Sequence, residues 1–212
     1  KPDAPTSSKG EEQPPVLEVP EFKGGVNFKE SKFNDSATFH DTVFGSTTSF
    51  ASTRFKEKAD FKDANFTGHT IFSRVIFKKE AIFTDATFKK IISSVVNSPI
   101  ATADFNNATF GKTTDFRDAY FEGFTNFSNA NFEGEANFAS ATFKVSDGFA
   151  DFTDVTFDKS ANFLSTTFIG PLGFYGAKFV KKEPRFAFQE SLSLAARFSC
   201  SVAPECYIFN IS

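Results

Sequence analysis

The sequence has no tryptophan and no methionine, and its 212 residues include only three tyrosines, two histidines and two cysteines. No run of about 18 apolar residues occurs, so no segment is long enough to form a transmembrane helix. Lysine and arginine total 23 and aspartate and glutamate total 26, which gives a net charge of −3. A balance this even excludes nucleic-acid recognition by overall charge alone.

The scarcity of histidine and cysteine also removes most catalytic chemistries. No group of Cys and His residues has the spacing of metal ligands, and His40 and His69 fall at different positions of the repeat described below. No glycine-rich loop joins a strand to a helix, and no serine lies in a G-x-S-x-G pattern. We therefore expect a protein that is not an enzyme and that has no catalytic residue, metal, cofactor or small-molecule substrate.

The start of the chain and its two cysteines bear on the compartment. The chain begins at Lys1 without Met, which suits either a mature protein after signal-peptide removal or an excised segment. Cys200 and Cys206 are close in sequence and form a local disulfide if the protein is exported, whereas two free thiols are the alternative. We expect export, to an extracellular, cell-surface or periplasmic location.

Phenylalanine is in large excess, with 33 residues. A conventional core mixes side chains of several shapes, so one residue type used this often indicates one environment repeated many times. From Phe22 to Phe179 the phenylalanines recur at alternating steps of five and six residues. These steps match neither the period of a helix nor that of an ordinary strand.

A coil that turns a corner after each short strand accounts for the steps. The Phe and the small residue two positions earlier then both point inward, because alternate residues share a face. Four sides of five, six, five and six residues give the spacing of 22 that separates Phe28, Phe50 and Phe72. About seven coils, each rising ~4.8 Å, predict a rod of roughly 33 Å. The expected core ladder includes Phe61, Phe66, Phe105, Phe110, Phe127, Phe132, Phe138 and Phe143.

Two gaps interrupt the ladder. Phe88 and Phe105 are 17 residues apart, which equals three links of six, five and six residues. We therefore predict that the phase is preserved and that Ser94 and Pro99 occupy two Phe positions. In the second gap, around Gly148, a link of six residues contains three extra residues at a corner.

Short motifs within the repeat carry a family resemblance. Ala59-Asp60-Phe61, Ala64-Asn65-Phe66, Ala103-Asp104-Phe105 and Ala136-Asn137-Phe138 resemble the A-(D/N)-(L/F)-x-x unit of pentapeptide-repeat proteins. The resemblance covers about three quarters of the chain and implies an all-β fold, a right-handed quadrilateral β-solenoid. The extra residue at every second link departs from the family's five-residue period and is expected to bulge two diagonally opposite corners.

Composition divides the chain into three parts. Residues 1–20 are a Pro-rich N-terminal tail, residues 21–182 are the predicted solenoid, and residues 183–212 are a predicted C-terminal cap. Within the cap, residues 189–198 are predicted to form a short helix over the last coil, because a solenoid end exposes apolar rings and unpaired backbone.

One apolar group lies at outward positions of the repeat. Ile71, Ile76 and Ile82 occupy three successive sides of one coil, and Ile91 and Val95 follow in the irregular segment. We predict that these five residues form an interaction surface, because exposed apolar clusters mark contacts. The alternative is that the irregular segment folds over this belt and buries it.

Two functions follow from the sequence. The first is a structural or interaction protein, exported, that self-associates end to end or laterally into an assembly or filament, with strand addition at the uncapped N-terminal coil. Its partner is a second copy or another protein, without direct contact to nucleic acid. The alternative, implied by the family resemblance, is a mimic of DNA that binds a type II topoisomerase such as gyrase. That mechanism requires a strongly acidic surface, which a net charge of −3 does not supply.

Overall fold

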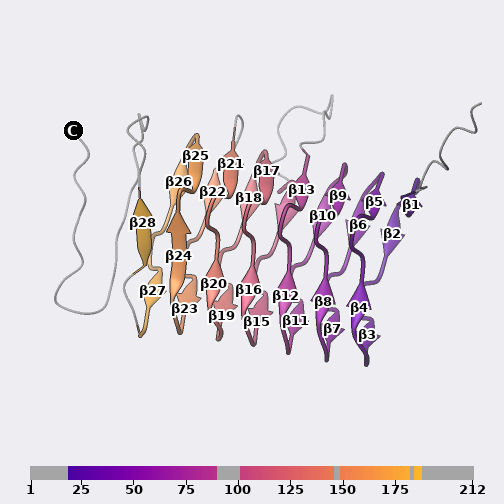
Figure 1. Cartoon of the computed structure of the whole chain (residues 1–212), viewed down its shortest axis with the longest axis horizontal. Coiled ribbons are helices and arrows are strands. Elements are labelled where there is room, and N and C mark those ends of the chain that lie inside the picture. The colour runs from indigo at the N-terminus through magenta and orange to yellow at the C-terminus, as the bar shows by residue number, and fades with distance from the viewer. Residues whose placement is uncertain (1–18, 90–100, 146–148, 182–183, 188–212) are drawn as a thin grey trace, which may run out of the picture.

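The structure, a computed structural model, describes residues 19–89, 101–145, 149–181 and 184–187. The described residues form 28 strands in four parallel sheets of seven strands each, which we name faces A to D. Four consecutive strands, one from each face, make one coil, and about seven coils stack along the axis (Figure 1). The predicted right-handed quadrilateral β-solenoid is confirmed. No helix occurs among the described residues, so none there is long enough to cross a membrane.

The strands are two to four residues long, and every pairing joins strands four apart in sequence order. Face A contains β1 (Glu21–Phe22), β5 (Val43–Phe44), β9 (Asn65–Phe66), β13 (Thr87–Phe88), β17 (Tyr120–Glu122), β21 (Thr142–Lys144) and β25 (Thr167–Ile169). Face B contains β2 (Val26–Asn27), β6 (Thr48–Ser49), β10 (Thr70–Ile71), β14 (Ala103–Asp104), β18 (Thr125–Asn126), β22 (Ala150–Asp151) and β26 (Leu172–Gly173). Face C contains β3 (Lys32–Phe33), β7 (Arg54–Phe55), β11 (Ile76–Phe77), β15 (Thr109–Phe110), β19 (Asn131–Phe132), β23 (Thr156–Phe157) and β27 (Lys178–Phe179). Face D contains β4 (Ala37–Thr38), β8 (Ala59–Asp60), β12 (Ala81–Ile82), β16 (Thr114–Asp115), β20 (Ala136–Asn137), β24 (Ala161–Leu164) and β28 (Arg185–Ala187).

Phenylalanine rings fill the interior in four columns, one per face. Ring centroids of Phe110 and Phe132 lie 4.5 Å apart, those of Phe77 and Phe110 lie 5.4 Å apart, and both pairs are nearly parallel. Rings on the opposite faces B and D meet edge to face, as in Phe105–Phe116 at 5.5 Å and 85°. All eight rings of the expected ladder have an exposed fraction of 0%. Both arrangements match the quadrupole preference of aromatic rings.

The residue two positions before a core Phe also points inward, and it is mostly Ala or Thr because four rings already fill each layer; Val75, Val155 and Leu172 are larger exceptions. Where it is threonine, its hydroxyl donates to a nearby backbone carbonyl, as from Thr70 to Gly68 at 3.1 Å and from Thr48 to Ser46 at 3.2 Å. These buried hydroxyls therefore carry no unpaired donor.

The two link lengths make two kinds of corner. In the five-residue links a tight turn closes with the N–H of the third residue after the Phe donating to the Phe carbonyl, as in Ser31 to Phe28 at 3.0 Å. The residue before that donor is left-handed, as at Asp63 with φ 56° and Asn107 with φ 56°. Asp, Asn and Ser dominate these positions because their short polar side chains tolerate this conformation.

The Asn and Asp residues that precede Phe on faces B and D have a structural role beyond solvation. Their side-chain oxygen accepts the backbone N–H two residues later, as from Ser128 to Asn126 at 2.9 Å and from Arg117 to Asp115 at 3.0 Å. These hydrogen bonds fix the backbone at the start of the five-residue corner. The repeated A-(D/N)-F motif thus encodes an inward small residue, a turn-stabilising acceptor and an inward ring.

The predicted register after Phe88 is wrong. Asn65 of β9 pairs with Thr87 of β13, which is the regular spacing of one coil. Thr87 in turn pairs with Tyr120 of β17, which lies one and a half coils further along the sequence. An insertion as long as half a coil therefore separates the two coils, and Phe105 stacks on Phe72, with centroids 5.0 Å apart. Because the insertion is half a coil long, the alternation of five and six continues unchanged across it.

We expect deletion of residues 90–100 to leave the solenoid intact. The link from Phe88 to Phe105 then has six residues, like the equivalent link from Phe66 to Phe72. A melting temperature within a few degrees of the parent is expected, because each halving of the length of a loop changes the free energy of closing it by only about 0.6 kcal/mol. Deletion of residues 111–121 has the same length but removes two core rings, and thermal denaturation of that variant is the control. Equal losses in the two deletions would contradict the corrected register.

The second gap is an insertion at the same corner, between faces A and B. Ala103 pairs with Thr125 at the regular spacing of one coil, and Thr125 pairs with Ala150 of β22 in the next coil. The second spacing is longer than the first by three residues, which are the three extra residues predicted from the sequence. Beside it Phe149 stacks on Phe124 outside the core, with centroids 5.0 Å apart.

The C-terminal part of the chain is described only in part. Face D continues to β28, which lies in the stretch predicted to be the cap and pairs with β24. The predicted helix at residues 189–198 and the Cys200–Cys206 pair lie outside the described residues.

Candidate interaction surface

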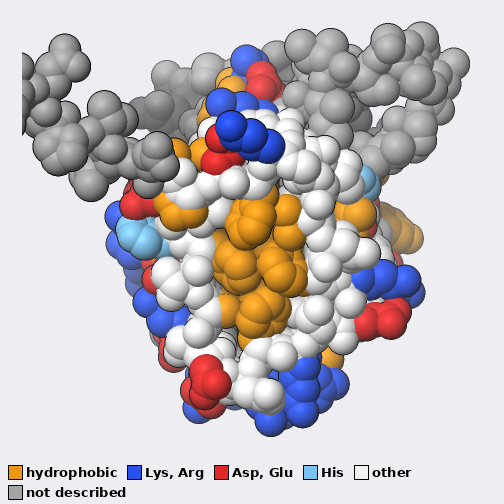
Figure 2. Space-filling view, turned by 90° about the vertical axis from the view of Figure 1, so that its right-hand side faces the viewer, with side chains coloured by type: hydrophobic (Ala, Val, Ile, Leu, Met, Phe, Trp, Pro, Cys, Tyr) orange, Lys and Arg blue, Asp and Glu red, His pale blue; other side chains and the backbone are white. Residues whose placement is uncertain are grey.

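The N-terminal end of the solenoid combines open strand edges with exposed rings. Strands β1, β2, β3 and β4 each stand at the end of their sheet in the described structure, so each has a partner on one side only. The Phe22 ring is 40% exposed, and Phe28, Phe33 and Phe39 are half-buried. Figure 2 shows the resulting apolar patch at the centre of this end, surrounded by polar and charged side chains. We call these four rings and their strands the N-terminal end face.

The rings at the other end of the stack are covered. Phe168 and Phe174, which extend the columns of Phe22 and Phe28, are only 4% and 1% exposed. Phe179, in the column of Phe33, is half-buried. The two ends therefore differ in how much apolar ring surface is accessible.

The N-terminal end face is held in place by the coil behind it. Phe33 stacks on Phe55 with centroids 4.7 Å apart and an interplanar angle of 4°, and Phe28 stacks on Phe50 at 5.0 Å. Because these rings are already ordered by stacking, they lose little side-chain entropy when a partner covers them.

Charges at the edge of the end face are of both signs. Glu21 pairs with Lys23 at 4.0 Å, and Lys29 pairs with Glu30 at 3.5 Å, with all four side chains well exposed. These paired charges do not repel their counterparts on an identical rim, whereas Lys32 of β3, which has no ion pair among the described residues, is exposed on face C, at the side of the rod.

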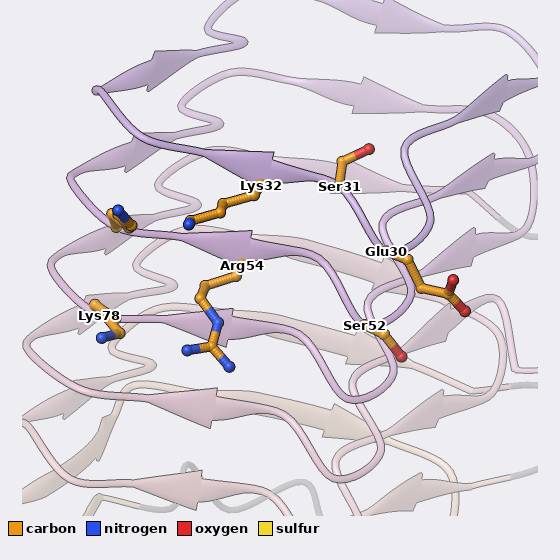
Figure 3. A pocket seen from close by; sticks show the side chains of 7 residues that line it. Glu30, Ser31, Lys32, Ser52, Arg54 and Lys78 are labelled. Atoms are coloured by element: carbon orange, nitrogen blue, oxygen red, sulfur yellow. The ribbon is translucent and has the colours of Figure 1, made fainter.

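A second feature is a cationic hollow on face C near the same end. It is an open depression of about 280 Å³, and Figure 3 shows Lys32, Arg54 and Lys78 on one side of it and Glu30 on the other. Its lining residues are Glu30, Ser31, Lys32, Ser52, Arg54, Lys56 and Lys78. Sequence reasoning missed it, although the spacing of 22 that relates Lys32 to Arg54 and Lys56 to Lys78 is visible in the sequence.

Comparison with known families gives three overlapping matches to the model described as pentapeptide repeats (9 copies), over residues 28–76, 50–90 and 72–119. Together these matches span residues 28–119, and the structure continues the same coil to Phe179. Residues 28–119 are therefore pentapeptide repeats. Neither the comparison with curated proteins nor that with solved structures gave a match. The match to pentapeptide repeats supports a structural or interaction protein in general, on a fold that is generally non-enzymatic.

The predicted apolar belt is only partly within the described pentapeptide repeats. Ile71, Ile76 and Ile82 lie on β10, β11 and β12 at outward positions and are half-buried. Their register partners in the next coil are polar, for example Asp104 beside Ile71. Ile91 and Val95 lie outside the described residues. The belt as an interaction surface stays a prediction.

One small polar cluster in the described part of the chain has the composition of metal ligands. Ligand atoms of His40, Asp41 and Asp63 lie within 4.8 Å of one another. His40 Nδ1 is 3.2 Å from Asp41, and Lys62 Nζ is 2.9 Å from Asp63. Since the side chains already pair with each other and with Lys62, we assign them no ligand.

Asp60 and Asp104 occupy equivalent places before a Phe, yet their pKa values shift in opposite directions. Burial raises the pKa of Asp104, and the N–H of Asn106 and the charge of His69 only partly offset it. Burial also raises the pKa of Asp60, but the hydrogen bond from Lys58, whose Nζ is 2.8 Å away, and other contacts bring it below 3.8.

We therefore expect Asp104→Asn to raise the melting temperature at pH 7 and Asp60→Asn to lower it. Asn keeps the turn acceptor in both cases and removes only the charge. The pKa of Asp104 in the folded protein is raised above its ordinary value of 3.8. The contribution of Asp104 to folding stability therefore falls as the pH rises from 3.8 through the raised pKa. The folded pKa of Asp60 is lowered, so its contribution is present above 3.8 and is lost as pH falls through that pKa. Thermal denaturation from pH 7 down to about pH 3 checks both signs, and equal shifts in the two variants would contradict them.

Proposed function

We propose that this β-solenoid protein is a non-enzymatic interaction protein that pairs with a second copy of itself through the N-terminal end face. The observation that carries the proposal is the contrast between the two ends. Phe22 is 40% exposed, whereas Phe168, at the other end of its column, is 4% exposed. Accessible ordered rings beside open strand edges are what a partner requires for both hydrophobic burial and strand addition.

The contrast also favours one symmetry. A head-to-tail filament would need accessible rings at both ends, and Phe174 is only 1% exposed. Pairing of two identical end faces about a two-fold axis buries both sets of rings and covers the open edges. The expected assembly is therefore a closed dimer, a more limited form of the end-to-end association that the sequence suggested.

The chemistry of the end face is compatible with self-pairing. Each copy presents four short strand edges around four rings, and a two-fold axis places each edge against an antiparallel one. Covering apolar surface contributes about 25 cal/mol per Å², so most of the affinity comes from the rings and the edges set the orientation. An exported location agrees with this proposal but is not required by it.

Mimicry of DNA has no comparable support. A protein that imitates DNA presents acidic groups where phosphates would lie. Face C instead presents Lys32, Arg54 and Lys78 around a hollow in its first coils. We therefore do not propose topoisomerase binding.

Sedimentation velocity tests the dimer. The parent is expected to sediment as a dimer at ~100 µM, and Phe22→Lys to weaken the dimer at least tenfold, equivalent to about 1.4 kcal/mol. Tyr175→Lys is the matched control, since Tyr175 is 65% exposed but lies in the last coil. A parent that stays monomeric, or equal weakening by Phe22→Lys and Tyr175→Lys, would overturn the proposal. Circular dichroism establishes that both variants are folded.

A further inference from the structure

We propose that the cationic hollow on face C is a binding site for a phosphate or sulfate group. Four cations line it, and none of them has an ion pair within the described residues. By contrast Lys23, Lys29, Lys58 and Lys62 on the same coils all lie within 4.0 Å of a carboxylate oxygen. The hollow thus concentrates the positive charge that this end of the rod leaves uncompensated.

The backbone register fixes this grouping. Lys32 and Arg54 are direct partners in the pairing of β3 with β7. Lys56 and Lys78 each follow a Phe of the next strand pair, where Phe55 is the partner of Phe77. Neighbouring strands lie about 4.8 Å apart, so the backbone positions that carry these side chains stay close together.

The cations lie close enough for their charges to repel one another. The pKa of Lys32 is lowered, first by the charge of Lys56, then by its contact with Lys56 and by burial, and further by Arg54 and Lys78. Glu30 does not relieve this repulsion, because it lies at the opposite side of the hollow (Figure 3) and pairs with Lys29 at 3.5 Å. An anion placed between the cations would relieve it.

The chemistry of the lining favours a tetrahedral oxyanion over a carboxylate. The cations come from three successive coils, so a ligand needs several acceptor oxygens pointing in different directions. The Arg54 guanidinium offers a planar pair of donors, the lysines offer point charges, and the hydroxyls of Ser31 and Ser52 offer neutral donors. Phosphate and sulfate satisfy such a set, and a hollow of about 280 Å³ accommodates one such group. The group arrives as a free ion or as a substituent of a polymer or lipid headgroup.

Two fourfold variants with equal loss of charge test the site. The hollow variant carries Lys32→Gln, Arg54→Gln, Lys56→Gln and Lys78→Gln. The control carries Lys23→Gln, Lys29→Gln, Lys58→Gln and Lys62→Gln. Isothermal titration with inorganic pyrophosphate, dextran sulfate and vesicles of phosphatidic acid in phosphatidylcholine gives the three arms. The probe that binds most tightly identifies whether the anionic group belongs to a free ion, a polymer or a lipid headgroup.

We expect the parent and the control to bind alike, within about twofold, and the hollow variant to bind at least about tenfold more weakly. NMR of the lysine side chains adds a readout independent of affinity, since a saturating anion is expected to raise the pKa of Lys32 toward its ordinary value. Equal losses in both variants would show an effect of net charge alone and overturn the site. Failure of the parent to bind any of the three probes would also overturn it.

Discussion

Replacing Phe127 by alanine is expected to lower the free energy of unfolding by about 3–5 kcal/mol. The ring is 0% exposed and stacks between Phe105 and Phe152, with centroids 4.7 Å and 5.0 Å away. Phe138 meets it edge to face at 5.6 Å. The substitution removes contacts on every side, and the coils above and below cannot close the cavity because backbone hydrogen bonds fix their spacing.

Phe22→Ala is the matched control. Phe22 occupies an inward position of the same repeat, but it is 40% exposed and stacks on one ring only, Phe44 at 5.3 Å, among the described residues. Its loss should cost about 1–2 kcal/mol, in line with partial burial of a ring. Guanidinium denaturation monitored by circular dichroism gives both values. An unchanged midpoint for Phe127→Ala, or equal losses in the two variants, would contradict the account of the core.

Gly134→Ala is expected to be strongly destabilising. A Cβ at Gly134 would overlap the carbonyl carbon and oxygen of Lys112 in the preceding coil. The obstacle is backbone rather than a movable side chain, so the two coils must separate at that corner. Overpacking of this kind costs about 3 kcal/mol or more.

Gly24→Ala separates this steric effect from the general effect of losing a glycine. A Cβ there meets no heavy atom of the described residues within 4 Å. Restriction of the unfolded chain then dominates, and the variant should be unchanged or more stable by about 0.4–1 kcal/mol. Thermal denaturation of both variants provides the measurement. A Gly134→Ala protein as stable as the Gly24→Ala protein would show that the coils pack less closely at Gly134 than the structure indicates.

The repeat itself predicted most of the fold. The steps of five and six between phenylalanines determine the four faces, and the inward pairs such as Ala136 and Phe138 follow from strand geometry. What the pattern could not reveal was the register after Phe88. Each coil consists of two halves with the same pattern of five and six residues, so an insertion as long as one half leaves the sequence pattern unchanged. Only the pairing between coils distinguishes the two registers.

The candidate surfaces were harder to predict because they depend on neighbours in space. Phe22 and Phe127 both belong to the same repeat, and only their place in the stack makes one exposed and the other buried. The hollow on face C was in principle readable, since Lys32 and Arg54 are one coil apart. The opposite shifts of Asp60 and Asp104 were not, because they arise from Lys58 in one case and from burial in the other.

A distance between two copies tests the N-terminal pairing most directly. One variant carries a nitroxide label at Thr38→Cys, an exposed position in the first coil, and the other carries it at Lys178→Cys in the last coil. Both variants also contain Cys200→Ser and Cys206→Ser, so that only the introduced cysteine is labelled. Pulsed dipolar spectroscopy is expected to give a separation below ~35 Å for Thr38 and of ~60 Å or more for Lys178, since each rod is roughly 33 Å long. A short separation at Lys178, or no dipolar coupling at Thr38, would contradict pairing through the N-terminal end face.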